Sequence, residues 1–297
     1  YLFQNYMTKV QKSVILYIIV FFLFSIADVC RKIALETMDI YIVQAYVTGT
    51  MTVMLLLCAP FLGGFKSMIR FEKPWIILLK SMLLPVIILT SAFGLFYLDL
   101  ATFYTLIFIS PVIVAVLARL YFHEPIKPHH MLVFAMGFAG VLVVLRPGFE
   151  VINIGAVMVL IGALAFALNS LTNKVFHESS PSLPLVFYPA FLSAVIFFAA
   201  AFPDIEVPDL QTGMLIAVSA ASSGIAATLQ IRAYQIAAAN IPTPFHYTQL
   251  IWGVLFGYFL FGDVPGLWTW AGGTLIIGAG LFLYAVENNK KGYSIKC

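Results

Sequence analysis

The sequence predicts an all-α membrane protein whose ten transmembrane helices form two inverted five-helix repeats. Three observations lead to this fold class. Of the 297 residues, 62% are hydrophobic and only 10% are charged, whereas soluble chains have about 45–50% apolar and about 25% charged residues. The apolar residues fall into ten segments of membrane-spanning length, and the two halves of the chain resemble each other at offsets of 139 and 142 residues.

The ten apolar segments follow one another with short connections. A helix that crosses the hydrocarbon core needs about 20 mostly apolar residues, and charged residues, Pro and Gly mark the ends of such segments here. The predicted spans are 13–35, 40–62, 75–97, 100–122, 130–147, 155–176, 183–203, 210–235, 241–261 and 265–286. Because the connections have at most about a dozen residues, we expect one compact bundle without a separate soluble domain.

The distribution of basic residues predicts that both ends of the chain lie in the cytoplasm. With ten spans, the tails 1–12 and 287–297 lie on the same side of the membrane. Twelve Lys and Arg residues fall on that side and three on the other, and loops rich in Lys and Arg stay in the cytoplasm. We therefore expect a multi-pass protein of a cell membrane, in particular a bacterial inner membrane. Residues 1–6 precede Met7, which fits a native start, and we treat them as an added segment.

An internal repeat relates the two halves of the chain. Residues 24–28 align with residues 166–170 at an offset of 142, and residues 110–124 align with residues 249–263 at an offset of 139. The identities are sparse, but they fall in the same order in both halves. A true repeat is the preferred interpretation, and chance similarity among apolar helices is the alternative.

Each repeat contains five predicted spans, over residues 13–147 and 155–286. Because five is odd, the second copy must enter the bilayer from the side opposite to the first. Inverted repeats of this kind provide two related conformations, open to either side, around one central site. The architecture therefore favours alternating access over a fixed pore.

The first repeat carries one acidic residue well inside a span. Asp28 precedes Arg31 by three residues and Lys32 by four, and these spacings place side chains on one face of a helix. Charges within a bilayer are costly and usually face a cavity or a partner. Asp28 is therefore a candidate substrate-binding residue or proton site. The alternative is that it neutralises the two basic residues near the outer interface.

The second repeat offers two asparagines and a polar stripe. Asn169 and Asn173 are four residues apart on one helix face, where they suit either a polar ring edge or adhesion between helices. His246 and Gln249 lie on the ninth span, and Trp252 lies too deep there for an interfacial residue. This stripe suits a flat, amphipathic ligand. A buried histidine paired only with a backbone carbonyl is the alternative.

Four further residues complete the predicted substrate site. Ser110 is the repeat mate of Gln249, and Tyr188 aligns with a tyrosine of the first repeat. Gln230 belongs to a polar series on the eighth span, and Tyr97 belongs to an aromatic series on the third. Aromatic residues at helical spacing are more often packing residues than ligand contacts, which is the alternative for Tyr97.

Other residues within the spans have structural explanations. Lys80, Arg119 and Arg232 lie near cytoplasmic ends of spans, where long basic side chains reach the interface by snorkelling. Three prolines inside spans are expected to bend them, namely Pro85, Pro111 and Pro189.

The sequence shows no pattern for catalysis, nucleotide hydrolysis or metal binding. It contains no GxxxxGK[ST] and no HExxH motif, and its three cysteines are scattered without a CxxC pair. The formal net charge of +3 gives no indication of nucleic-acid binding. We expect no catalytic residue, no metal and no cofactor. The expected partners are a small-molecule substrate and the lipid bilayer, and the expected assembly is a monomer or a homodimer.

Several short motifs give the chain a family resemblance. They are Ser110-Pro111, His123-Glu124-Pro125 and Arg146-Pro147-Gly148 in the first half, and Asn173-Lys174, Ser222-Ser223-Gly224, the run from Pro244 to Gln249 and the run from Phe261 to Pro265 in the second. With these motifs the chain resembles the ten-helix EamA-type members of the drug/metabolite transporter superfamily over nearly the whole of 13–287. The last two motifs and residues 28–32 look most like the branch that contains riboflavin importers and S-adenosylmethionine carriers.

The resemblance implies a secondary active transporter rather than an enzyme. It implies that a small amphipathic metabolite crosses the membrane by alternating access, with riboflavin as the first candidate and S-adenosylmethionine or another amino-acid-derived metabolite or drug as the second. Two alternatives come from other classes. An intramembrane enzyme would need clustered acid, base or metal groups, and a non-transporting receptor would not need polar stripes at matching depth.

Overall fold

The computed structural model of the chain describes most of the sequence. The described residues are 2–62, 64–68, 73–98, 103, 106–123, 126–145, 154–176, 178, 180–202, 204–239, 241–261 and 266–289. The predicted tail beyond residue 289 and the motif residues 124–125, 146–148 and 262–265 lie outside these ranges.

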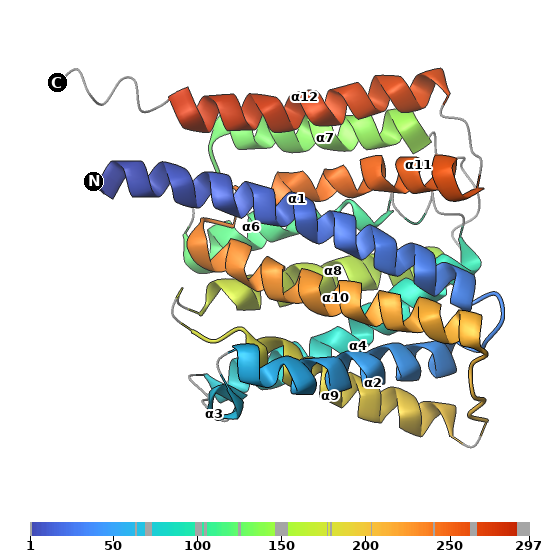
Figure 1. The fold of residues 1–297 in the computed structure, drawn as a ribbon. Helices are drawn as coiled ribbons and strands as arrows, with labels where there is room; N and C mark the ends of the chain where they lie inside the picture. Colours follow the sequence, from blue (N-terminus) through green and yellow to red (C-terminus); the bar gives the residue numbers. More distant parts are fainter. Residues whose placement is uncertain are drawn as a thin grey trace.

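In the described residues, ten helices of 13 to 33 residues lie side by side and alternate in direction (Figure 1). The first half contains α1 (Leu2–Ala34), α2 (Ile40–Cys58), η1 (Ala59–Leu62), α3 (Phe65–Met68), α4 (Pro74–Tyr97), α6 (Ser110–Phe122) and α7 (Pro128–Leu145). The second half contains α8 (Ile154–Lys174), α9 (Leu183–Ala201), α10 (Leu210–Ile236), η2 (Thr243–Tyr247), α11 (Thr248–Phe261) and α12 (Leu267–Asn289). The predicted all-α fold class is confirmed.

Six of these helices are long and apolar enough to cross a membrane, as judged over the described residues. They are α1 from Lys9 onward, α2, α4, α8, α9 and α10. Helix α1 begins at Leu2, so residues 2–12, which the sequence predicts as a tail, are part of the first helix. Helix α1 begins and α12 ends at the same end of the bundle (Figure 1).

Two spans that the sequence predicts as uniform α-helices are irregular. Residues 108–109 form a turn before α6, so the predicted helix over 100–122 is wrong in this part. In the second half, η2 occupies 243–247 and α11 begins only at Thr248. The two irregular segments correspond at the repeat offset of 139. Pro111 lies in the first turn of α6, where its missing N–H is tolerated, so it starts a helix instead of bending one.

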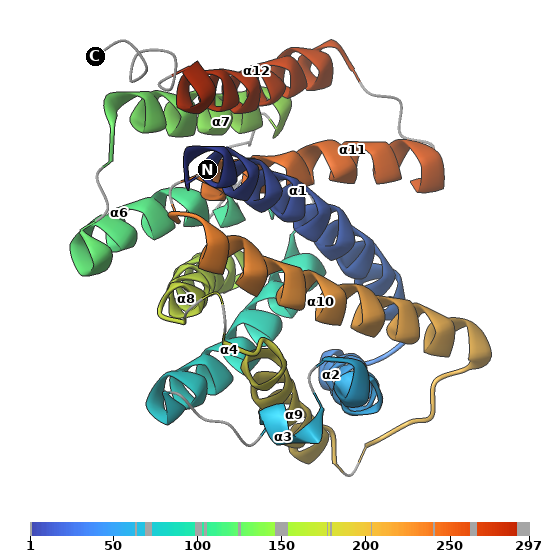
Figure 2. The same cartoon turned by 60° about the vertical axis from the view of Figure 1, so that its left-hand side comes forward.

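The helices pack with the symmetry that a repeat requires. Helix α1 packs on α10 and its mate α8 packs on α4; α4 also packs on α9, as α10 does on α2. The mated pairs α7·α12 and α2·α9 lie at opposite edges of the bundle (Figure 2). Helix α8 runs opposite to α1 (Figure 1), so the two halves are inverted.

Two lysines repeat the same contact in both halves. Lys32 of α1 donates to the carbonyl oxygen of Leu95 at 3.5 Å, and Lys174 of α8 donates to the carbonyl oxygen of Ala237 at 2.5 Å. Both donors and both acceptors are separated by the offset of 142. A basic side chain near the end of a helix thus holds the end of the neighbouring helix in each repeat.

Candidate functional site

A cavity of about 140 Å³ lies between helices of both repeats. It has room for several water molecules or a small organic group. Helices α1, α2 and α4 of the first half and α8, α9, α10 and α11 of the second contribute side chains to it, together with η2. Its polar and charged lining residues are Asp28, Arg31, Thr48, Lys80, Ser91, Asn169, Ser223, Gln230, His246 and Gln249.

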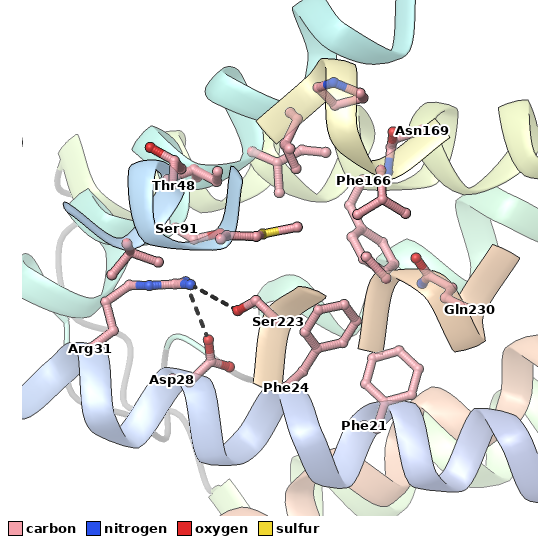
Figure 3. A pocket seen from close by; sticks show the side chains of 18 of the residues that line it. Phe21, Phe24, Asp28, Arg31, Thr48, Ser91, Phe166, Asn169, Ser223 and Gln230 are labelled. Atoms are coloured by element: carbon pink, nitrogen blue, oxygen red, sulfur yellow. Dashed lines mark hydrogen bonds and ion pairs between the residues drawn. The ribbon is translucent and has the colours of Figure 1, made fainter. Parts of the chain in front are cut away.

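A charged cluster occupies one end of the cavity (Figure 3). The Nη1 atom of Arg31 lies 3.7 Å from Oδ1 of Asp28, and Nη2 donates to Oγ of Ser223 at 3.3 Å. Gln249 donates through Nε2 to Oδ2 of Asp28 at 3.0 Å. The side chains of Arg31 and Asp28 are only 10% and 15% exposed. Three helices therefore meet at this ion pair, because α1 carries both charges and α10 and α11 carry their polar partners.

Lys80 forms a second polar cluster. Its side chain is buried, and its Nζ donates to Oδ1 of Asn169 at 3.0 Å and to Oδ1 of Asn173 at 2.8 Å. The snorkelling explanation for Lys80 is therefore wrong. Lys80 lies on the face of α4 that packs against α8, so its ammonium group reaches the two amides of α8 instead of the interface.

His246 joins the polar lining to the aromatic wall. Its ring stacks on Phe21 with the ring centres 3.9 Å apart, and its Nδ1 lies 3.3 Å from Oγ of Ser110. Phe166 lies 5.2 Å from the same imidazole. Figure 3 shows Phe21, Phe24 and Phe166 between the charged end and the end with Asn169 and Gln230. The cavity thus offers flat aromatic faces between two polar regions.

The structure brings together seven of the ten residues that the sequence predicts for a substrate site. Five of them line the cavity, namely Asp28, Asn169, Gln230, His246 and Gln249. Ser110 and Asn173 contact lining residues, through His246 and Lys80 respectively. Among the described residues, Gln230 also has a buried Nε2 atom for which no hydrogen-bond partner is found within the usual hydrogen-bonding distance.

The other three predicted residues lie away from the cavity lining. Tyr97 is 49% exposed at the end of α4. Tyr188 donates its hydroxyl to the carbonyl oxygen of Met68 at 3.1 Å. Trp252 packs edge-on against Phe22, with ring centres 4.9 Å apart. An aromatic residue can lie on the outward or on the inward face of a helix, and its spacing in the sequence does not tell which of the two faces it occupies.

Sequence reasoning missed Lys80, Arg31 and the aromatic wall as lining residues. One signal for the wall was present, because Phe24 and Phe166 are repeat mates at the offset of 142. The signal for Lys80 was its position inside an apolar run, six residues after Pro74. A snorkelling lysine occupies the same kind of position, so this signal does not distinguish a cavity residue from a residue at the interface.

Comparisons with known proteins agree with this architecture. The family model described as "EamA-like transporter family" matches residues 11–146 and again 153–285. A protein of Rickettsia bellii named "S-adenosylmethionine uptake transporter" is 26% identical over 231 residues, which are 78% of this chain and 79% of that protein. A "Riboflavin transporter" of Rhizobium johnstonii is 27% identical over 235 residues, 78% of each chain.

A solved crystal structure shares the fold. It superimposes with a TM-score of 0.76 at 13% sequence identity, over 92% of this chain and 96% of the other. At this identity the similarity concerns the fold alone.

Proposed function

Because this chain belongs to the EamA-like transporter family and is a multi-pass membrane transporter, we propose that it is a secondary active carrier that moves a small amphipathic metabolite across a cell membrane by alternating access. The relatives reported above are named transporters and not enzymes. The proposal assigns the membrane to the bacterial inner membrane and both ends of the chain to the cytoplasm, in agreement with the distribution of Lys and Arg.

One observation carries the proposal, namely the cavity between the two inverted halves. Charged side chains from the first half and amide side chains from the second converge on it, although burying such groups within a bilayer is costly. Helix–helix adhesion alone does not require a cavity. A ligand that needs both aromatic faces and polar groups would account for the cavity and for its lining.

The proposed movement is a rocking of the repeats 13–147 and 155–286 about this cavity. The turn before α6 and the 3-10 helix before α11 lie at related positions in the two repeats. An irregular segment next to a helix provides a place where backbone angles can change while the rest of the helix stays rigid. These two segments are therefore the proposed hinges.

The lining favours a substrate with a flat ring and an amino-acid-like end. A ring can lie against Phe24 and Phe166, while an ammonium group can meet Asp28 and a carboxylate can meet a cavity cation. S-adenosylmethionine has these parts, and because it is larger than the cavity of about 140 Å³, its binding requires the two repeats to move apart. Riboflavin is the second candidate, because its ring system fits the same aromatic wall and amide donors, but it has no charged group for Asp28 or Lys80.

Uptake into proteoliposomes tests the proposal. The purified protein is reconstituted, and the accumulation of radiolabelled S-adenosylmethionine and of radiolabelled riboflavin is measured against protein-free liposomes. Saturable uptake of either compound, reduced by Phe166→Ala, supports the carrier and its site. If neither is taken up and neither raises the melting temperature, both substrate assignments are wrong.

A further inference from the structure

The cavity has an excess of positive charge. Among the described residues that line it, Arg31 and Lys80 are cations and Asp28 is the one anion. Asp28 lies beside Arg31, at 3.7 Å. Lys80 has only the neutral oxygens of Asn169 and Asn173 as partners in the described structure. The two clusters therefore differ in charge balance.

The internal repeat shows which charge the cluster around Lys80 lacks. The offset of 142 relates Arg31 to Asn173, and an offset of 143 relates Ser223 to Lys80. The contact between Arg31 and Ser223 thus has its counterpart in the contact between Asn173 and Lys80, with the cation on the other helix.

The counterpart of Asp28 in this relationship is Ser170, at the offset of 142. Ser170 is fully buried, and its Oγ has no hydrogen-bond partner in the described structure. The second cluster therefore repeats the cation of the first cluster without repeating its carboxylate. A buried cation without a counter-charge is costly within a membrane.

We propose that Lys80 is the anchor for an anionic group of the transported molecule, a carboxylate foremost. The proposal rests on the proposed function, since it takes the cavity as the substrate site. The substrate carboxylate supplies the counter-charge that the second repeat lacks. Asn169 and Asn173 hold the ammonium group of Lys80 in position for this carboxylate. Charge-assisted hydrogen bonds of this kind are the strong ones.

The first experiment measures the thermal stability of the ligand-free full-length protein. Asn173→Asp places a carboxylate at the position of an oxygen that is 2.8 Å from Nζ of Lys80. We expect its melting temperature to be equal to or above that of the wild type. The matched control is Gln44→Glu, which buries an acid at a site where both amide atoms lack partners in the described structure. We expect this control to lower the melting temperature. An Asn173→Asp protein that melts as early as the control overturns the proposal.

The second experiment compares an aromatic carboxylate with its uncharged amide, using 2-naphthoate and 2-naphthamide as probes in melting-temperature titrations. The wild type and Lys80→Arg should bind the carboxylate about tenfold or more tightly than the amide. Lys80→Met and Asn173→Asp should bind the two probes equally. Equal binding by the wild type, no binding of either probe, or a preference that survives in Lys80→Met overturns the proposal.

The results of these two experiments are independent of the uptake assay in proteoliposomes. A protein that prefers the carboxylate through Lys80 but accumulates no metabolite in proteoliposomes retains the anion anchor and contradicts the proposed function. If the wild type and Lys80→Met accumulate metabolite equally well, the carrier function is retained and the anchor role of Lys80 is contradicted.

Discussion

Gln249 of α11 donates to the carboxylate of Asp28 of α1 across 3.0 Å, and this bond joins the second repeat to the first. Among the described residues that line the cavity, Asp28 has the only carboxyl group. An amide donor stabilises the charged form of a carboxylate. Protonation of Asp28, or its engagement by a substrate cation, would therefore change a contact between the two halves whose rocking we propose.

The first prediction concerns the coupling of transport to a proton gradient. Asp28→Asn removes the titratable group and keeps the shape of the side chain. We expect this variant to lose accumulation driven by a pH gradient, while it still exchanges labelled for unlabelled substrate across the membrane at a reduced rate. Both rates are measured in proteoliposomes with and without an imposed gradient.

Two control variants separate coupling from folding. Asp28→Glu keeps a carboxyl group and should retain part of the gradient-driven accumulation. The double variant Asp28→Asn/Arg31→Met removes the cation that the single variant leaves unpaired, and it should melt at a higher temperature than the single variant. Unchanged gradient dependence in Asp28→Asn would show that the proton is carried elsewhere.

The second prediction concerns the closure of the end of the bundle where α1 begins. The hydroxyl of Tyr17 lies 2.8 Å from that of Tyr234, which lies 3.2 Å from Oγ1 of Thr243. One turn closer to that end, Ser13 donates to the carbonyl oxygen of Ala233 at 2.8 Å. Tyr17 and Ser13 belong to the first repeat and their partners to the second, so this buried series holds the two repeats together.

Tyr17→Phe removes one buried hydrogen bond, which contributes about 1 kcal/mol, and should increase the population open at this end by about fivefold. The measurement is the rate at which a membrane-impermeant thiol reagent labels Gln230→Cys in a protein whose native cysteines are replaced by serine. Tyr258→Phe, whose ring is 45% exposed on α11, is the matched control. Equal labelling rates of Gln230→Cys in the parent protein, in Tyr17→Phe and in Tyr258→Phe would argue against a closure at Tyr17.

The sequence was sufficient for the features that depend on local composition. Apolar runs predicted the helices, and the offsets of 139 and 142 predicted which helices are mates. Asp28, Asn169 and His246 stand out because they are polar residues within apolar runs, and the structure places all three in the cavity lining.

The features that depend on distant contacts could not be predicted in this way. Lys80 finds its partners about one-third of the chain away, on α8, and only the packing of α4 against α8 decides that it points inward. The turn at 108–109 and the junction of η2 with α11 lie inside segments whose overall hydropathy predicts one membrane span each. Hydropathy does not register a turn or a change of helix type within such a span.

The third prediction concerns the start of α10 and its dependence on pH. Asp209 accepts a hydrogen bond from the backbone N–H of Thr212 at 3.1 Å and forms the N-cap of α10. Hydrogen bonds from the side chain and the backbone of Thr212 lower the pKa of the Asp209 carboxyl. The cap therefore stabilises the protein above the unfolded-state pKa of about 3.9, and this contribution is lost as the pH falls through the lower folded-state pKa.

Asp209→Ala should lower the melting temperature slightly at pH 7, and the difference from the wild type should disappear in acid below the folded-state pKa. Asp209→Ser keeps a capping oxygen without a titrating group, so its melting temperature should stay near that of the wild type at pH 7. A difference between Asp209→Ala and the wild type that persists unchanged into acid would mean that the carboxylate charge plays no part.

The last prediction concerns the close packing of α7 against α12. A Cβ atom added at Gly140 would lie 2.8 Å from the backbone oxygen of Gly272 and 2.8 Å from Cγ1 of Ile276. Small residues let transmembrane helices approach closely, so Gly140→Ala should force the two helices apart. We expect a loss of about 1–3 kcal/mol of stability, measured as a lower melting temperature in detergent.

Gly273→Ala on α12 is the matched control, because a Cβ atom there meets nothing within 4 Å. Alanine has a higher helix propensity than glycine by about 1 kcal/mol, so this variant should melt at the same temperature as the wild type or slightly above it. Since both variants add one methyl group to a glycine of the same helix pair, the sign of the difference depends on the contact alone. Equal effects of the two substitutions would show that α7 and α12 are not in close contact at Gly140.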